Sequence, residues 1–263
     1  MCNGSIMDKL ISFALPLMLS GILQLMFNAV DLVVVGHFSG QEALAAVGST
    51  TALIAVFTNL FIGISLGANV LAARFYAAGR DKEMSETVHT SIMLALISGV
   101  AMAIVGVIFA KGALQLMDTP DDVIDLSTLY MRIYFMGMPA MMVYNFGSAL
   151  LRAKGDTRRP LYYLTASGVI NVCLNLLFVI EFRMGVAGVA AATSISQFLS
   201  AGLVVRCLSK EEDAFRLELK KMKIHMNRLK AIMQIGLPAG FQGVLFSLSN
   251  VVIQSAINTF GDV

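Results

Sequence analysis

The chain has 263 residues, of which 57% are hydrophobic and 14% are charged, and its formal net charge is +2. An ordinary soluble domain carries roughly 25% charged residues and covers its surface with polar groups. The composition therefore excludes a typical soluble enzyme, a disordered chain and a nucleic-acid-binding protein. Three cysteines are too few for a disulfide framework.

Long apolar runs predict an all-α integral membrane protein. A helix that spans a bilayer needs ~20 mostly apolar residues, and six complete runs of about that length follow one another along the chain. These runs are residues 10–36, 47–76, 88–110, 126–151, 161–180 and 184–208. A seventh run begins near Leu229 and continues to the last residue. We predict a six-helix transmembrane bundle followed by an incomplete seventh helix.

Lysine and arginine residues are distributed very unequally between the predicted loops. If the N-terminus is cytoplasmic, the cytoplasmic segments hold 16 of the 19 and the outside segments hold two, Lys111 and Arg183. Because positive residues favour the cytoplasmic side, we predict a multi-pass protein of the plasma (cell inner) membrane with a cytoplasmic N-terminus. Its direct surroundings are then membrane lipids.

A weak internal repeat relates the first run to the seventh. A shift of 222 residues aligns seven identical pairs over 32 positions, among them Pro16 with Pro238 and Asn28 with Asn250. Such parallel repeats occur in transporters. We predict a six-helix lobe over 1–208, a cytoplasmic linker over 209–229 and the start of a second lobe over 230–263. We expect a C-terminal lobe to be the missing partner, and the chain alone not to transport.

Asp31 is the one acidic residue deep inside an apolar run. An ionisable group within a membrane-spanning helix is costly and marks a candidate site for ions or protons. Asp31 is thus a candidate coupling residue that takes up a proton on one side and releases it on the other. The alternative is a helix end in contact with water, because Asp31 lies roughly 31 Å along the helix from Leu10.

Polar side chains recur at helical spacing in three of the runs. Each set shares one helix face, and together they form either a polar chamber in the outer half of the lobe or ordinary hydrogen bonds between helices. The sets are Gln24, Asn28 and Asp31; Ser167, Asn171 and Asn175; and Thr193, Gln197 and Ser200.

Two further features allow two interpretations each. Pro16 removes a backbone hydrogen bond inside the first run, so it marks either a hinge or a static kink. The 209–230 segment mixes Lys220, Lys221 and Lys223 with apolar residues, so it either lies on anionic headgroups or is an ordinary linker. The three histidines are scattered, and we predict no metal site.

Several segments resemble the multidrug and toxic compound extrusion (MATE) family of transporters. They are Ala14-Leu15-Pro16-Leu17-Met18, Asn28-Ala29-Val30-Asp31, the 40–48 segment, the 152–158 loop and the 185–193 segment. The resemblance covers the whole chain in order. It implies a twelve-helix, two-lobe exporter, of which this chain is the first lobe and the start of the seventh helix.

The resemblance also implies roles for individual residues. Asp31 matches the family's essential aspartate and Pro16 its kink proline, while Asn171 and Thr193 match polar members of the chamber. Asn175 departs from the many relatives that carry a second aspartate there. This leaves Asp31 as the lone titratable group, acting as a proton carrier or as a sodium ligand with the amides. Gln24, Asn28 and Gln197 are then expected to line the substrate chamber.

A second departure indicates the branch of the family. The sodium-driven branch carries a glutamate about two turns after its Gly-Leu-Pro, and Phe246 stands at that position here. The chain therefore resembles the DinF-like branch.

The function that the resemblance implies is a cation-coupled antiporter, driven by H⁺ or Na⁺, that exports cationic or amphipathic organic compounds. It needs no cofactor beyond the coupling ion. One alternative is a flippase for lipid-linked precursors, which requires a basic cavity. A second alternative is an intramembrane enzyme, which requires a catalytic pair or metal ligands. A third alternative is an inactive, truncated lobe.

Overall fold

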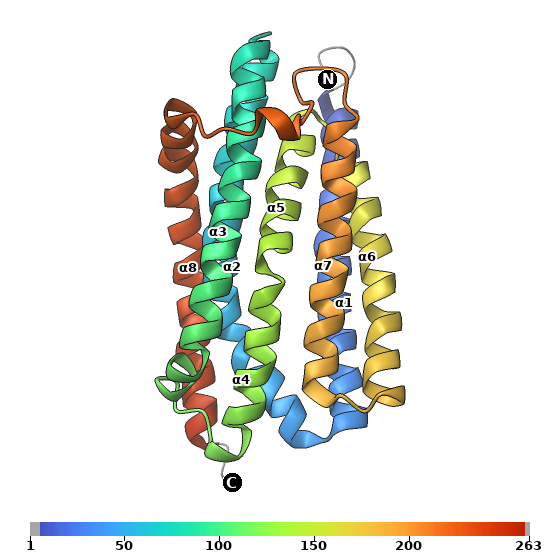
Figure 1. The fold of residues 1–263 in the computed structure, drawn as a ribbon, viewed down its shortest axis with the longest axis vertical. Coiled ribbons are helices and arrows are strands. Elements are labelled where there is room, and N and C mark those ends of the chain that lie inside the picture. Colours follow the sequence, from blue (N-terminus) through green and yellow to red (C-terminus); the bar gives the residue numbers. More distant parts are fainter. Residues whose placement is uncertain (1–5, 261–263) are drawn as a thin grey trace.

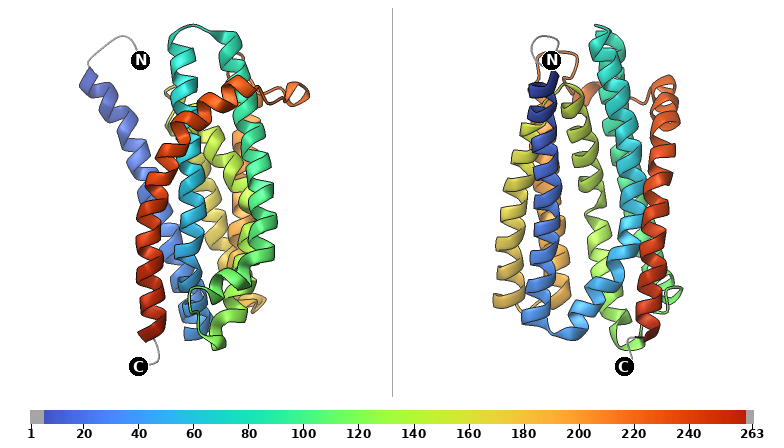
Figure 2. Two further views of the ribbon diagram at one scale, coloured as in Figure 1. Left: turned by 90° about the vertical axis from the view of Figure 1, so that its left-hand side faces the viewer. Right: turned by 180° about the vertical axis from the view of Figure 1, so that it is seen from behind.

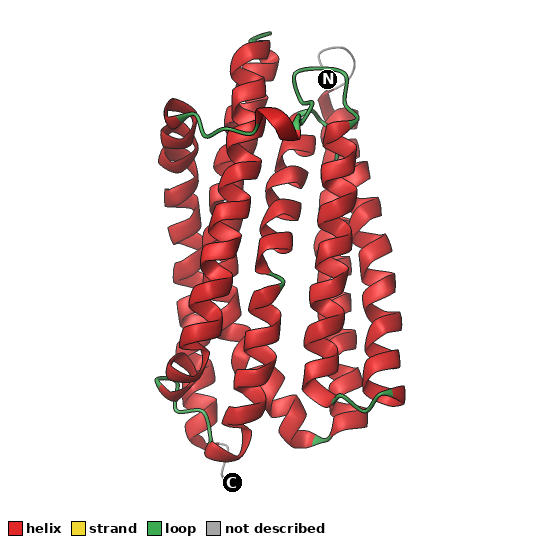
Figure 3. Cartoon of the chain, in the orientation of Figure 1, coloured by secondary structure: helices red, strands yellow, loops and turns green. Residues whose placement is uncertain are grey.

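The structure is a computed structural model that describes residues 6–260, and every regular element in this range is helical (Figure 3). In chain order the elements are α1 (Ile6–Ser39), α2 (Gln41–Ala77), α3 (Asp81–Gln115), α4 (Asp121–Met136), α5 (Met138–Ala153), α6 (Arg158–Leu176), the π-helical turn η1 (Leu177–Glu181), α7 (Gly185–Ser209), the short 3₁₀ turn η2 (Leu219–Lys221) and α8 (Met226–Phe260).

The helices run roughly alongside one another in a single elongated bundle (Figure 1). The start of α1, the α5–α6 loop and the segment between α7 and α8 lie at one end, which we call the linker end. The connections after α1, α3 and α6 lie at the opposite end. Six helices of the described range are long and apolar enough to cross a membrane: α1, α2, α3, α6 with η1, α7 and α8. The prediction of an all-helical membrane protein is confirmed.

The prediction of one continuous helix over residues 126–151 is wrong. The structure has two helices, α4 and α5, that run end to end and meet at Gly137 (Figure 1). Pro139 has no backbone N–H, and the N–H of Gly137 bonds to the oxygen of Tyr134 instead of continuing the α-helical pattern. The hydroxyl of Ser194 on α7 donates to the carbonyl oxygen of Ile133 at 3.0 Å. A neighbouring helix thus satisfies a carbonyl freed by the break.

Helix α1 contains Pro16 and has the least buried apolar segment of the six long helices. It contacts α6 and α2 but leans away from α8 towards the linker end (Figure 2). The hydroxyl of Ser20 donates to the carbonyl oxygen of Pro16 at 2.7 Å. The role of Pro16 as a hinge stays a prediction.

Helix α8 packs along α2 through direct contact of the two backbones. A Cβ atom on Gly63 would lie 2.1 Å from the backbone nitrogen of Gly240, and one on Gly67 would lie 2.3 Å from the carbonyl oxygen of Ile232. Only glycine allows such an approach. Further along the same pair of helices, the amide of Asn59 donates to the hydroxyl of Ser247 at 2.7 Å.

Candidate functional site

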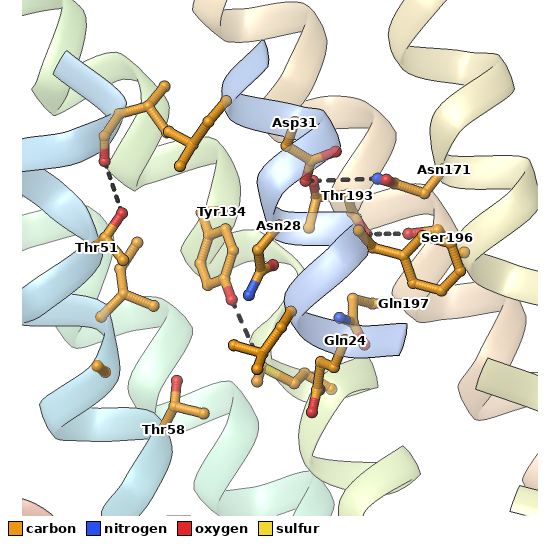
Figure 4. Close-up of a pocket in the computed structure, with 18 of the residues that line it drawn as sticks. Gln24, Asn28, Asp31, Thr51, Thr58, Tyr134, Asn171, Thr193, Ser196 and Gln197 are labelled. Carbon is orange, nitrogen blue, oxygen red and sulfur yellow. Dashed lines mark hydrogen bonds between the residues drawn. The ribbon is translucent and has the colours of Figure 1, made fainter. Parts of the chain in front are cut away.

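A cavity of about 490 Å³ opens between α1, α2, α4, α6 and α7, and Met141 of α5 also lines it. Of the polar residues predicted from the three stripes, it brings together Gln24, Asn28, Asp31, Ser167, Asn171, Thr193 and Gln197. Figure 4 shows six of these side chains converging from α1, α6 and α7: Gln24, Asn28, Asp31, Asn171, Thr193 and Gln197. Their helical spacing accounts for this, since residues at i, i+4 and i+7 or i+8 lie on one face.

Asp31 lies on α1 eight residues before its end, and its residue surface is 8% exposed. Its carboxylate accepts a hydrogen bond from the amide nitrogen of Asn175 on α6. The hydroxyl of Thr193 on α7 lies 3.5 Å from the second carboxylate oxygen. The same hydroxyl lies 2.9 Å from the carbonyl oxygen of Val189, to which it donates. A buried carboxylate is tolerated when it accepts a hydrogen bond, and the amide of Asn175 on α6 donates that bond here.

The amides of α6 complete this group. The nitrogen of Asn171 donates to the hydroxyl of Thr193 at 3.3 Å, and its side-chain oxygen lies 3.4 Å from the nitrogen of Asn175. Asn175 is fully buried, and its side-chain oxygen has no partner within the range that the structure describes. Four oxygen-bearing side chains from three helices therefore meet at one point, and one of these oxygens is unsatisfied.

The helix changes its form directly after this group. The π-helical turn η1 follows α6 and begins two residues after Asn175. Such turns insert a residue into the helical repeat and are frequent at functional sites. No pattern in the sequence indicated this turn.

Two of the predicted stripe residues do not line the cavity. Asn175 lies behind it, in contact with Asp31, and Ser200 is buried and donates to the carbonyl oxygen of Gln197 at 2.9 Å. Ser200 therefore takes neither of the two roles considered above, because its hydroxyl is satisfied within its own helix.

The structure adds lining residues that the sequence analysis missed. They come from α2, α4 and α7, and they bear hydroxyl, amide or phenol groups: Thr51, Thr58, Asn59, Tyr130, Tyr134 and Ser196. Tyr130 and Tyr134 are spaced i, i+4, the same signal that identified the other stripes. Among the residues that the structure describes, Asp31 alone has a formal charge and lines the cavity.

Comparison with known proteins identifies the family. The family model described as MatE matches residues 16–177, more than half of the chain. The chain belongs to the MatE family. It is 32% identical to the probable multidrug resistance protein YoeA of Bacillus subtilis over 95% of this chain and 55% of that protein. It is 21% identical to the multidrug export protein MepA of Staphylococcus aureus over 99% of this chain and 58% of that protein.

Solved MATE structures share the fold. A crystal structure of MATE in the bent conformation superposes with a TM-score of 0.88 at 24% identity, over 97% of this chain and 57% of that one. An inward-facing MATE transporter gives a TM-score of 0.81 at 24% identity, over 90% of this chain and 56% of that one. The chain thus spans about half the length of the relatives it matches, which corresponds to one MATE lobe. The MatE family consists of transporters and not of enzymes.

Proposed function

We propose that this chain is the N-terminal lobe of a cation-coupled antiporter of the DinF-like branch, and that the complete antiporter exports cationic or amphipathic organic compounds. The coupling ion binds at Asp31, and the substrate binds in the cavity beside it. The N-terminus lies in the cytoplasm, and the 209–229 linker leads to a second lobe that begins at residue 230.

The observation that carries this proposal is the contact between Asp31 and Asn175 at the wall of the cavity. The amide of Asn175 can serve both states of the carboxyl group. When Asp31 is ionised, the amide nitrogen donates to it, as in the structure. When Asp31 binds a proton or a sodium ion, rotation of the amide presents its unsatisfied oxygen, which can accept a hydrogen bond from the protonated carboxyl group or coordinate the ion.

The character of the cavity supports a cationic or amphipathic substrate. Within the described range 6–260, its lining contains one carboxylate, no lysine or arginine, and several phenol, amide and aliphatic groups. A cation gains from the charge of Asp31, while apolar and aromatic walls accept the rest of an organic molecule. A flippase for lipid-linked precursors needs a basic cavity, so this lining argues against that alternative.

Transport in proteoliposomes tests the proposal, with a transporter that joins this lobe to its second lobe. Proton and sodium gradients are imposed separately, which identifies the coupling ion. The Asp31→Asn variant should lose gradient-driven efflux while it keeps much of its substrate binding, because the amide keeps the shape but cannot change its charge. Asp125→Asn removes a carboxylate from an exposed ion pair with Lys111 and should retain efflux. Gradient-driven efflux by Asp31→Asn at the wild-type rate would contradict the proposal.

A further inference from the structure

The second half of the segment that joins α7 to α8, together with the first turns of α8, carries a positive charge that the transport site does not use. From Arg216 to Lys230 it contains six lysine and arginine residues and one acidic residue, Glu218. We define the basic strip as Leu219, Lys220, Lys221, Lys223 and Met226. All five of its side chains are exposed, Leu219 at 63% and Met226 at 73%.

The basic strip is fixed at both ends to the side of α3. The backbone N–H of Glu218 donates to the ring nitrogen Nε2 of His89 at 3.2 Å. The backbone N–H of His225 donates to the hydroxyl of Thr90 at 3.1 Å. These two bonds hold the intervening residues against one short stretch of α3, and the strip therefore has a defined position on the bundle.

That position is the edge of the apolar part of α3. Charged residues occupy the first turns of α3 up to Glu86, and the next one along the chain is Lys111. The 20 residues from Ser91 to Ala110 carry no charge and span about 30 Å, which is the thickness of the hydrocarbon core of a bilayer. His89 and Thr90 therefore lie directly outside the core, at the depth of the lipid headgroups.

The bundle also continues beyond the strip. Thr90 lies nine residues after the first residue of α3, or about 14 Å along the helix. Figure 2 shows the linker leaving the side of the bundle below the tip of the α2–α3 connection. The strip thus faces sideways at the membrane surface and does not hang below the protein in water.

The chemistry of the strip matches a membrane surface that carries negative charge. Lys221 pairs with Glu218 at 2.9 Å, whereas Lys220 and Lys223 form no ion pair with any residue that the structure describes. Exposed apolar side chains beside lysines are the pattern of segments that lie in the interface, with the apolar groups among the lipids and the charges at the phosphates.

We propose that the basic strip binds the headgroups of anionic phospholipids in the adjoining leaflet. This leaflet is the cytoplasmic one in the orientation given above. The binding does not depend on transport, and it ties the linker between α7 and α8 to the lipid composition of that leaflet. Raised salt weakens it, because the attraction between exposed charges is screened.

Fluorescence quenching in vesicles tests this proposal. The chain has no tryptophan, so Leu219→Trp places the only tryptophan of the chain in the strip. The protein is reconstituted into vesicles of phosphatidylcholine with a minor fraction of phosphatidylglycerol. Bromine on the lipid serves as the quencher, and two preparations are compared. One contains brominated phosphatidylglycerol, and the other contains the same mole fraction of brominated phosphatidylcholine. We expect brominated phosphatidylglycerol to quench at least about twofold more strongly than brominated phosphatidylcholine, since basic groups enrich anionic lipid around them.

Two charge-matched variants make the result decisive. In the Leu219→Trp background, Lys220→Gln, Lys221→Gln and Lys223→Gln together should abolish the preference for phosphatidylglycerol. The control removes three exposed positive charges elsewhere at the linker end, through Lys82→Gln, Arg158→Gln and Lys210→Gln, and should retain the preference. Equal quenching by the two lipids in the parent protein, or no quenching by either, overturns the proposal. A loss of the preference in the control variant also overturns it, because the effect then reflects net charge and not the strip.

Discussion

The carboxylate of Asp31 on α1 accepts a hydrogen bond from the amide of Asn175 on α6, and 144 residues separate the two along the chain. Both residues are buried, although most of the surface of α1 is exposed in this chain. The contact therefore joins α1 to α6 at Asp31, the charged residue in the lining of the cavity.

Removal of this contact from the side of Asn175 should destabilise the lobe. Asn175→Ala leaves the buried carboxylate without its amide donor, which costs about 1–3 kcal/mol of unfolding free energy. Asp31→Asn removes the charge itself and should cost less. The double variant should therefore be more stable than the sum of the two single effects predicts, with a coupling on the order of 0.5–3 kcal/mol. Unfolding of the purified chain in detergent measures all three variants.

The control for this cycle combines Asp31→Asn with Asn69→Ala. Asn69 donates to the carbonyl oxygen of Ala149 at 2.6 Å and does not line the cavity. The effects of this pair should add. If the effects of Asp31→Asn and Asn175→Ala on the free energy of unfolding were also additive, the hydrogen bond between the two residues would contribute nothing to stability.

The close packing of α2 and α8 predicts opposite effects for two glycines of the same helix. Gly63→Ala places a Cβ atom 2.1 Å from the backbone of Gly240, and backbone cannot move aside as a flexible side chain can. The helices must separate, at a cost of about 1–3 kcal/mol. A Cβ atom on Gly48 would meet no neighbouring group within 4 Å, so Gly48→Ala should leave stability unchanged or raise it by about 0.5–1 kcal/mol.

Thermal unfolding of the two variants in detergent distinguishes them. Asn59→Ala, which removes the hydrogen bond to Ser247 in the same interface, should lower stability in the direction of Gly63→Ala. Equal stability of the Gly63→Ala and Gly48→Ala variants would mean that α8 does not pack on α2 in this way.

An ion-pair cluster at the linker end predicts a pH dependence. Burial raises the pKa of Asp213, but the hydrogen bonds from Lys154 and from the backbone N–H of Phe215, with the charge of Lys154, outweigh it and hold the pKa below its ordinary value. Asp213 therefore stabilises the fold above the pKa of an unfolded aspartate, roughly 3.9, and this contribution is lost as the pH falls through the lower pKa of the folded state.

Asp213→Asn should accordingly lower the unfolding midpoint at pH 7, and the difference from wild type should vanish in strong acid. The effect should be small, about 0.2–1 kcal/mol, because the Asp213 side chain is 40% exposed and water screens the pair. Glu212→Gln, at an exposed neighbour without an ion pair in the described part of the chain, should show no difference at either pH. A difference between wild type and Asp213→Asn that persists in acid would have another cause.

Much of the fold could be predicted because a bilayer restricts the chain to helices of a set length. The apolar runs located α1, α2, α3, α6 and α7 to within a few residues at most ends. The break between α4 and α5 was visible as Gly137 and Pro139, yet a proline in a membrane helix is compatible with a continuous span as well. Ser194 of α7 bonds to the broken region, and this contact belongs to the tertiary structure.

The sequence predicted which polar residues share one face of a helix, but not which helices face one another around the site. Spacing placed Gln24, Asn28 and Asp31 on one face, and the structure adds that Thr58 and Tyr134 face them across the cavity. Which helices face each other is decided by packing between segments far apart in sequence, such as α1 with α6 and α2 with α8. The same limit applies to the linker, whose bonds to His89 and Thr90 have no local sequence signal.

Membrane orientation is the remaining prediction, and it rests on the distribution of basic residues. The linker end holds the loops rich in lysine and arginine, and the opposite end holds the turn with Asp118, Asp121 and Asp122. Because positive residues are retained in the cytoplasm during insertion, the linker end should be cytoplasmic. Single cysteines at Asp121 and at Lys82, two exposed positions at opposite ends of the bundle, report the orientation in intact cells.

An impermeant thiol reagent added outside should label Asp121→Cys, and should label Lys82→Cys only after the membrane is permeabilised. The natural cysteines are first replaced by serine, since Cys173 is itself exposed. A cysteine at Lys154 should behave like one at Lys82, although the ion pairs of Lys154 with Glu211 and Asp213 make Lys82 the milder replacement. The reverse labelling pattern would place the basic end outside. It would also move the proposed lipid contact of the basic strip to the other leaflet, while the vesicle experiment would keep its outcome.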